Sequence, residues 1–325
     1  MGRIPLLDLH LHLEGSIPSA ALRRLAARHR AGVPDLAFDG FTGFLRAFGR
    51  VCDLLRDRRD FELAAWSVFE RWRALGADHV EVRFSPQAHL RRGVSLTSIL
   101  DGVLLARARA ERRGGMSVAL VADGVRQWGP DWFDQVVRSL APWAGRGIEA
   151  VGMGGDERAF PARIFAPAFR LARRLGFRST VHAGETEGAA SVRSALCLGA
   201  DRIGHGARAV EDPDLVRLLA RRGTPLELCP GSNVATGVVP SLAEHPLPLL
   251  LRAGVRVTLG SDDGALFGTD IARERRRAVR AFGLSRREQA LLARHAVEAA
   301  FLSDGRRRRL LARVLRAEPS LRMRP

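Results

Sequence analysis

The chain has 325 residues, 46% of them hydrophobic and 27% charged, which is enough for one large α/β domain or two smaller ones. No uninterrupted apolar stretch approaches the length that crosses a bilayer, which excludes a membrane-spanning protein. The first strand-like run follows Met1-Gly2-Arg3 directly and leaves no room for a signal peptide. We therefore expect a soluble, cytoplasmic protein.

The formal net charge of +17 comes entirely from arginine, because all 52 basic residues are arginine and lysine is absent. Such a charge raises the possibility of a nucleic-acid partner. However, the arginines spread over nearly every expected helix and are not interleaved with aromatic residues, as a base-stacking surface requires. We do not expect nucleic-acid binding as the main role. The lack of lysine also excludes a Schiff-base lysine, a Walker lysine and a carbamylated lysine bridging two metals.

The three cysteines, Cys52, Cys197 and Cys229, are odd in number and far apart in the sequence. This spacing argues against a disulfide framework and against a cysteine zinc cluster. Three buried thiols are the expected state.

Short apolar runs alternate with longer helical patterns along the whole chain. The eight expected strands are 5–12, 79–85, 117–123, 149–154, 178–182, 202–205, 225–229 and 256–261. The expected helices between them include 19–29, 61–75, 96–113, 132–140, 161–175, 189–198 and 213–222. This alternation favours a closed parallel (β/α)₈ TIM barrel over an open sheet with two domains. We expect one domain, 1–325, with a helical insertion at about 16–76 and a helical C-terminal extension at about 269–325.

The first strand carries the start of a possible metal site. Strand side chains alternate between two faces, so Asp8, His10 and His12 are expected on one face and the leucines on the other. Two neighbouring imidazoles can bind one zinc ion. The alternative is an edge strand whose histidines face water. Asp8 is expected to orient a ligand or to form a hydrogen bond in the core.

The long insertion after this strand contains Phe38, Phe41, Phe44 and Phe48. These rings suit a pocket wall or lid, and they suit core packing equally well. Both interpretations stay open at this stage.

Further ionisable residues follow the later strands, where the active face of a barrel lies. His182, with His10, His12 and Asp262, makes an economical ligand set for a single zinc ion that leaves room for water. His205 suits a group that takes or orients the water proton, and Glu185 suits an acid that protonates a substrate. Asp263 is then free to bind substrate, and Gly155 offers an unobstructed backbone amide.

The remaining histidines, at positions 29, 79, 89, 245 and 295, receive a structural interpretation, because four protein ligands already fill the expected metal shell. Arg83 ends the second strand. It is expected either to contact substrate or to pair with Glu157 or another carboxylate.

Taken together, these motifs resemble the adenosine deaminase family in order and spacing over almost the full length. They are His10 to Gly15, Glu81 to Pro86, Gly155 to Glu157, His182 to Glu185, Gly204 to Gly206, Cys229-Pro230 with Ser232-Asn233, and Ser261 to Asp263. The resemblance implies a zinc-dependent barrel that hydrolyses the 6-amino group of a purine, by addition of water at C6 and loss of ammonia.

The same resemblance implies the role of each site residue. His10, His12, His182 and Asp262 would hold zinc. Glu185 would protonate the purine at N1, and His205 would act on the attacking water. Asp263 would contact N7, and the Gly155 amide would contact N3.

Two departures from the family pattern concern the substrate. Relatives that act on adenosine usually have Asp, which contacts the ribose, where this chain has Glu14; Glu is more typical of relatives acting on adenine or 6-aminodeoxyfutalosine. Gly264 also replaces the usual proline. In contrast, 232–237 and 266–269 resemble the nucleoside-acting branch. From these features we expect a 6-aminopurine nucleoside as substrate, with 6-aminodeoxyfutalosine or free adenine as the alternative.

Two other classes of protein remain open. One is a different metal-dependent hydrolase on the same barrel, from which ammonia release would distinguish a deaminase. The other is a non-catalytic purine or nucleic-acid binder, which would bind zinc without turnover.

Overall fold

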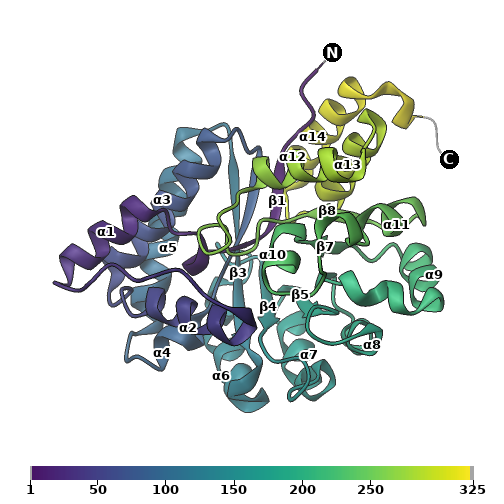
Figure 1. Ribbon diagram of the computed structural model, residues 1–325. Helices are drawn as coiled ribbons and strands as arrows, with labels where there is room; N and C mark the ends of the chain where they lie inside the picture. Colours follow the sequence, from purple (N-terminus) through teal and green to yellow (C-terminus); the bar gives the residue numbers. More distant parts are fainter. Residues whose placement is uncertain (1, 323–325) are drawn as a thin grey trace.

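Eight parallel strands, each hydrogen-bonded to the next in chain order, form the barrel of the computed structural model, which describes residues 2–322 (Figure 1). The strands are β1 (Leu7–His12), β2 (His79–Phe84), β3 (Ser117–Val125), β4 (Ala150–Gly154), β5 (Arg178–Ala183), β6 (Arg202–His205), β7 (Leu226–Leu228) and β8 (Val257–Leu259). The loop after β8 returns to β1, where the Asp262 amide donates to the His10 carbonyl at 2.8 Å and the His12 amide donates to the Asp262 carbonyl at 3.0 Å. The predicted TIM-type barrel is confirmed.

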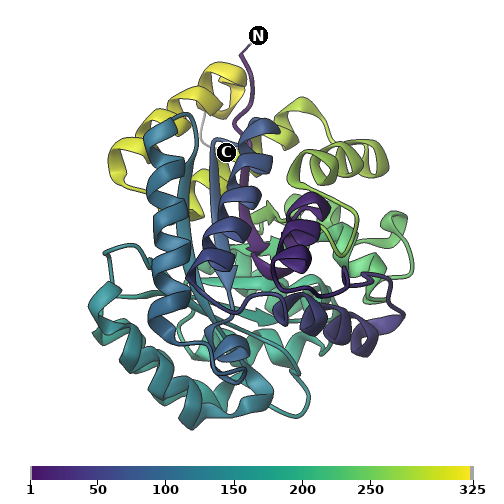
Figure 2. The same ribbon diagram turned by 90° about the vertical axis from the view of Figure 1, so that its left-hand side faces the viewer.

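Helices surround this sheet in both ribbon views (Figures 1 and 2). The α-helices are α1 (Ser19–Arg28), α2 (Gly40–Cys52), α3 (Arg58–Ala74), α4 (Pro86–Leu90), α5 (Leu96–Arg113), α6 (Pro130–Leu140), α7 (Ala166–Arg174), α8 (Ala189–Cys197), α9 (Pro213–Arg222), α10 (Pro230–Ala235), α11 (Leu247–Arg252), α12 (Ile271–Phe282), α13 (Arg286–Ala299) and α14 (Asp304–Ala317). The 3₁₀ turns are η1 (Glu14–Ser16), η2 (Arg126–Trp128), η3 (Ala141–Trp143), η4 (Ala162–Phe165), η5 (Ala207–Glu211), η6 (Leu242–Glu244) and η7 (Pro319–Arg322).

Local sequence signals explain where the structure differs from the expected helices. Helix α3 begins three residues before the expected start at Phe61, because Asp57 and Asp60 form a capping box around its first turn. The expected helix over 161–175 is divided into η4 and α7. Pro167 lies in the first turn of α7, where its missing amide costs no helical hydrogen bond.

The insertion and the C-terminal extension occupy different sides of the barrel. Helices α1, α2 and α3 lie between β1 and β2 in the chain. Helices α13 and α14 bury Ile4, Leu7 and Leu9 of the N-terminal segment in a second apolar cluster. In Figure 1 the yellow C-terminal helices lie beside β1 and β8, far from α2. The C-terminal extension thus packs against the N-terminal segment and the first half of β1.

A buried cluster of charged side chains from β2, β6 and β7 lies inside the barrel. Arg83 and Arg202 form ion pairs with Glu227, and Arg202 also pairs with Glu81, all four side chains being at most 1% exposed. Buried charges require such mutual pairing, because an unpaired charge in this environment is strongly destabilising. Arg83 therefore pairs with Glu227 and also lies 3.6 Å from Asp123 Oδ2, which is the expected pairing with a carboxylate other than Glu157.

The structure corrects the expected position of Asp8. A β-bulge shifts the register between Asp8 and Leu11, and an extra residue in a strand interrupts the alternation of its two faces. The Asp8 carboxylate accepts hydrogen bonds from the indole of Trp72 in α3 and from the Ser261 hydroxyl, at 2.8 and 2.6 Å. Asp8 is thus a core hydrogen-bonding residue outside the histidine face.

All three cysteines are free, and Cys52 and Cys229 are buried as expected. Cys197 was expected to be buried as well, but it lies exposed at the end of α8. Among residues 2–322 we find no helix that is both long and apolar enough to traverse a bilayer.

Candidate active site

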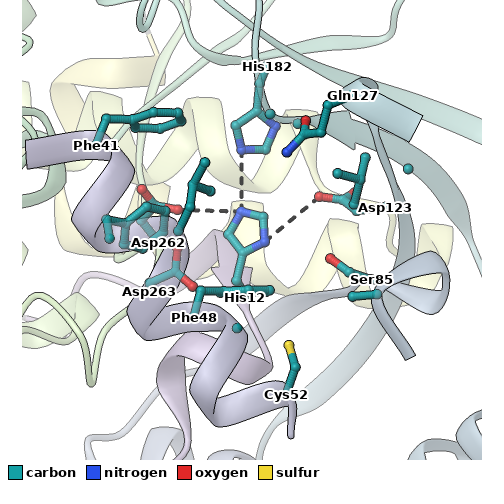
Figure 3. Close-up of a pocket in the computed structure, with 18 of the residues that line it drawn as sticks. His12, Phe41, Phe48, Cys52, Ser85, Asp123, Gln127, His182, Asp262 and Asp263 are labelled. Carbon is teal, nitrogen blue, oxygen red and sulfur yellow. Dashed lines mark hydrogen bonds and ion pairs between the residues drawn. The ribbon is translucent and has the colours of Figure 1, made fainter. Parts of the chain in front are cut away.

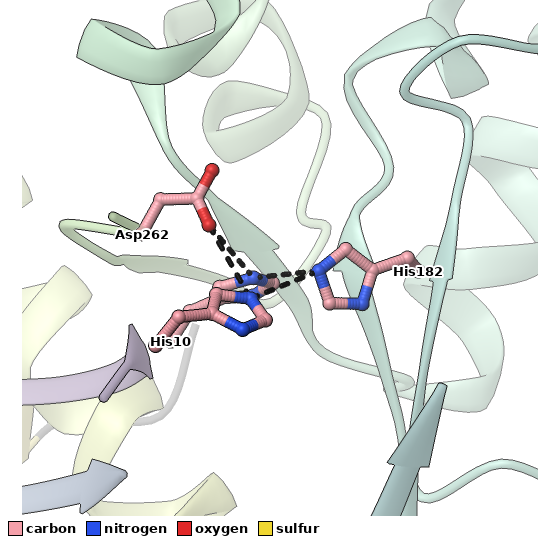
Figure 4. Close-up of side chains that lie close together, drawn as sticks. His10, His182 and Asp262 are labelled. Carbon is pink, nitrogen blue, oxygen red and sulfur yellow. Dashed lines mark hydrogen bonds and ion pairs between the residues drawn. The ribbon is translucent and has the colours of Figure 1, made fainter. Parts of the chain in front are cut away.

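Three imidazoles and one carboxylate from β1, β5 and the loop after β8 converge on one buried point (Figure 4). The Nε2 atom of His182 lies 3.0 Å from Nε2 of His10 and 3.3 Å from Nε2 of His12. Asp262 Oδ1 lies 3.6 and 3.4 Å from the same two atoms of His10 and His12. The structure thus brings together the four residues that the sequence indicated as ligands.

The hydrogen bonds behind the rings fix what their Nε2 atoms can do. His10 Nδ1 donates to the Glu227 carboxylate at 2.9 Å, and His182 Nδ1 donates to the Met153 carbonyl at 3.0 Å. Both Nε2 atoms therefore keep a lone pair. Burial lowers the pKa of His12 to about 4, so this ring is also neutral at pH 7. Converging lone pairs and a carboxylate need a cation between them, and three histidines with one aspartate suit zinc. The residues fit a metal site.

Glu227 accepts the hydrogen bond from His10 Nδ1 and is itself fixed by ion pairs with arginines. Arg83, Arg202 and the Thr180 hydroxyl all donate to its carboxylate, which is fully buried. Such carboxylates fix the orientation of a ligating histidine and raise its basicity. Sequence reasoning missed Glu227, because nothing local in 225–229 distinguishes it from a strand residue.

We expect Glu227→Gln to weaken zinc binding by about 10–100-fold, because glutamine cannot accept the same charged hydrogen bonds from His10 and both arginines. Titration against a chelator of known affinity measures this. The matched control is Glu149→Gln, which removes another glutamate–arginine pair, with Arg107 at 2.8 Å. Equal zinc affinity in the two variants would contradict the role of Glu227.

A cavity of about 240 Å³ opens above this cluster (Figure 3). One wall is aromatic, since Phe41, Phe44 and Phe48 of α2 line it. Phe44 also stacks on Phe267 with ring centroids 5.1 Å apart, so these rings form a pocket wall and a small apolar core together. The opposite wall comes from the ends of β3 and β4 and includes Gly155.

Glu185, His205 and Asp263 line the cavity beside the histidine cluster. His205 Nε2 lies 3.7 Å from both Glu185 Oε2 and Asp262 Oδ2. Burial, with the nearby Asp262 charge, raises the pKa of Glu185 to about 7. Burial and the adjacent Asp262 also raise the pKa of Asp263 well above its ordinary value. Both carboxyl groups can therefore hold a proton near neutral pH.

Backbone strain is concentrated at this site. In residues 2–322, three non-glycine residues have positive φ, and two of them are His205 at 58° and Asp262 at 59°. Such conformations cost of the order of 1–3 kcal/mol and persist where the surroundings enforce them. The neighbouring Gly15 shows similar constraint, because a Cβ there would lie 1.7 Å from Asp263 Oδ1. Only glycine leaves room for Asp263 at this point.

Glu14 does not line the cavity but lies fully buried behind it. Its Oε1 accepts hydrogen bonds from the Ser85 amide and from His89 Nε2, both at 2.9 Å, and its Oε2 has no partner within residues 2–322. Burial alone would raise the pKa of Glu14, but these hydrogen bonds outweigh it and lower the pKa. Glu14 is thus an ionised acceptor with one free oxygen. His89 was expected in a loop, but it lies in α4.

Two further acidic residues were not singled out as site residues in the sequence. Glu157 accepts the backbone amides of Gly184, Glu185 and Thr186 at 2.9–3.1 Å and so fixes the loop that carries Glu185. Asp123 lines the cavity, points toward the His12 ring at 3.8 Å, and has no hydrogen bond from residues 2–322 (Figure 3). Its position at the end of a strand was the only available signal.

The sequence matches the Adenosine deaminase family model over residues 5–317. The chain belongs to the adenosine deaminase family. It is accordingly an aminohydrolase, and not a metal-dependent hydrolase of another class on the same barrel. The predicted family, fold and reaction class are confirmed.

Individual relatives support a narrower comparison within the adenosine deaminase family. An adenine deaminase from Chelativorans sp. is 38% identical over 314 residues, covering 94% of this chain and 97% of the relative. An aminodeoxyfutalosine deaminase from Acidothermus cellulolyticus is 37% identical over 288 residues, covering 83% and 81%. These names favour the alternative substrates over the nucleoside that the sequence suggested.

Solved structures agree with the fold. The adenine deaminase from Arthrobacter aurescens has a TM-score of 0.92 at 34% identity, covering 97% of this chain and 99% of that one. An amidohydrolase from Burkholderia ambifaria with bound Zn has a TM-score of 0.87 at 22% identity, covering 98% and 93%.

Proposed function

We propose that this deaminase hydrolyses the 6-amino group of free adenine and releases ammonia, with zinc held by His10, His12, His182 and Asp262. Zinc in this site would act as a Lewis acid that lowers the pKa of a water molecule toward about 7. The rest of the chemistry falls to side chains that bind the purine and move protons.

The protonation states of the cavity carboxyls match the edge of a purine. N1 and N7 are hydrogen-bond acceptors, so a group that binds them must donate. Glu185, whose pKa burial raises to about 7, can donate its proton to N1. Asp263, whose pKa is also raised, can donate to N7. The amide of Gly155 is the proposed donor to N3.

The position and charge of Glu14 favour free adenine over a nucleoside as the substrate. With N1, N3 and N7 directed toward β5, β4 and the loop after β8, N9 faces the ends of β1 to β3. Asp123 lines the cavity there, and Glu14 lies directly behind Ser85, another residue of the cavity wall. A free base has an N9–H donor, whereas a nucleoside has a sugar there. An ionised, buried carboxylate with one free oxygen is a suitable acceptor for N9–H. The phenylalanine wall of α2 provides few polar partners for ribose hydroxyls.

The relatives named adenine deaminase support this proposal. The relative named aminodeoxyfutalosine deaminase supports a second candidate, in which the purine carries a large N9 substituent. Arg92, an exposed cation that lines the cavity and pairs with Asp53 at 2.7 Å, is the observation that favours it.

The test is ultraviolet-monitored deamination of adenine, adenosine, deoxyadenosine and 6-aminodeoxyfutalosine in parallel with the zinc-loaded protein. The proposal expects the highest kcat/KM for adenine. Faster turnover of either nucleoside would restore the original expectation, and faster turnover of 6-aminodeoxyfutalosine would establish the second candidate. Ammonia release from none of them would overturn the reading of the site as an aminopurine deaminase.

Glu14→Asp tests the proposed N9–H contact. Shortening the side chain by one methylene should withdraw the carboxylate from N9–H and make space beside it, lowering kcat/KM for adenine by about 10–100-fold. The ratio of adenosine to adenine turnover should rise, and because both substrates are measured on the same variant, the ratio is its own control. An unchanged ratio would contradict the assignment of Glu14.

A further inference from the structure

Behind His205 runs a buried series of hydrogen bonds that ends on a backbone amide. His205 Nδ1 lies 3.1 Å from Asn233 Nδ2, and Asn233 Oδ1 lies 3.2 Å from His245 Nε2. The backbone amide of Leu247 lies 3.2 Å from His245 Nδ1. The side chains of this series come from the end of β6, from α10 and from the residue after η6. His205, Asn233 and His245 are at most 3% exposed, so exchange with solvent is limited.

The Leu247 amide at the end of the series determines which atom donates and which accepts in each of these hydrogen bonds. A backbone N–H can only donate, so His245 Nδ1 accepts and the proton of neutral His245 is on Nε2. That proton is donated to Asn233 Oδ1, which turns the amide nitrogen of Asn233 toward His205. An amide nitrogen also only donates, so His205 Nδ1 accepts. The proton of neutral His205 must then be on Nε2.

Two observations support this direction. Burial lowers the pKa of His245 to about 4, with a smaller contribution from His205, so His245 is neutral and has a single N–H. The backbone of Asn233 is held on both sides, since its amide donates to the Cys229 carbonyl at 2.9 Å and its carbonyl accepts from Val239 at 3.0 Å. The side chain of Asn233 therefore extends from a fixed backbone position between the rings of His205 and His245.

We propose that Asn233 and His245 are positioning residues that hold His205 in the tautomer with its proton on Nε2. This N–H faces the space between Glu185 and Asp262, each 3.7 Å away. In this tautomer His205 donates a hydrogen bond to the attacking water or to the oxygen that becomes negative at C6. It does not remove the proton of the water, because Nε2 has no free lone pair. The inference rests on the proposed deamination, but not on which aminopurine is the substrate.

The tautomer can be measured without activity. In zinc-loaded protein labelled with ¹⁵N-histidine, long-range ¹H–¹⁵N correlations distinguish a protonated ring nitrogen from an unprotonated one. We expect His205 to be protonated at Nε2 and unprotonated at Nδ1, with its signals assigned by their loss in His205→Gln. A wild-type protein with His205 protonated at Nδ1 would overturn the proposal even if deamination is the correct function.

Asn233→Asp replaces the donor beside His205 Nδ1 by an acceptor of the same shape. The variant should move the His205 proton to Nδ1 and lower kcat by about 100-fold, with KM and zinc content unchanged. A purely structural role would instead lower thermal stability and leave the tautomer in place. Full kcat, or an unchanged tautomer, counts against the proposal.

If Asn233→Asp does not fold, a pair of variants at His245 tests the same proposal. Glutamine at position 245 can still donate to Asn233 Oδ1, so His245→Gln should retain most of the activity. Phenylalanine fits beside Phe282, whose ring centroid lies 5.9 Å away, but it cannot donate, so His245→Phe should reproduce the loss of kcat. His295→Gln alters another buried histidine, outside this series, and should leave kcat unchanged. Equal kcat in His245→Gln and His245→Phe would overturn the proposal.

Discussion

Glu185→Gln is expected to lower kcat by about 10³-fold while zinc content and KM stay close to the wild-type values. Glutamine has the same shape and can still donate a hydrogen bond to the purine N1, but it cannot transfer a proton. The loop that carries residue 185 remains fixed by Glu157, so the binding geometry should survive. Steady-state kinetics and metal analysis of one preparation measure all three quantities.

The pH dependence of the wild-type protein follows from the same group. Burial raises the pKa of Glu185 to about 7, so its carboxyl is protonated below this value and ionised above it. An acid must be protonated to act, and kcat/KM should therefore fall as the pH rises through about 7. Glu185→Gln should lack this alkaline decrease.

Glu187 provides the matched control two residues further along the chain. It forms a surface ion pair with Arg158 at 2.6 Å and lies outside the cavity wall. Glu187→Gln makes the same chemical change in the same loop and should leave kcat unaltered. A general acid contributes about 10²–10⁴-fold to the rate. Retention of more than a tenth of wild-type kcat by Glu185→Gln would therefore argue against Glu185 as the acid.

Asp262→Ala is expected to remove stoichiometric zinc and to lower turnover by about 10³-fold or more, because water without a metal is a poor nucleophile at neutral pH. Asp262 supplies the only carboxylate among the four converging side chains. Without it, three neutral imidazoles remain to balance a divalent charge. Metal analysis after dialysis, together with the shift in Tm on adding zinc, measures the loss.

The backbone at Asp262 requires a second variant. Its φ of 59° is unfavourable for alanine, so Asp262→Ala could lose zinc through strain in the loop after β8. Asparagine tolerates this conformation and retains an oxygen but not the charge. Asp262→Asn should therefore keep the fold and bind zinc weakly. Stoichiometric, tightly bound zinc in both variants would contradict the ligand assignment.

The sequence determined the architecture and the family because both depend on local patterns. Runs of β-branched and apolar residues alternate with helical patterns, and this alternation specifies a barrel. Motifs at the strand ends, such as His182 to Glu185, were visible because barrel chemistry gathers at one rim. His10 and His12 could be recognised as a pair because they are two positions apart in one strand.

The substrate preference was harder to predict because a residue type does not reveal its charge or its free lone pairs. Glu14 was noticed as a departure from the family pattern, but its ionised state depends on His89 and the Ser85 amide, more than 70 positions away. The β-bulge that turns Asp8 toward Trp72 is likewise a product of strand pairing. No period-two pattern in the sequence could indicate it.

What the sequence by itself determined was the barrel, the family and the residue types available at its rim, since these follow from periodicity and spacing along the chain. What only the tertiary structure decided was the protonation and direction of each group. Glu227 fixes the lone pair of His10, and Asn233 with His245 fixes the proton of His205, through contacts 12 to 217 positions apart. Proton positions depend on which donors and acceptors meet in space, and only the folded chain brings them together.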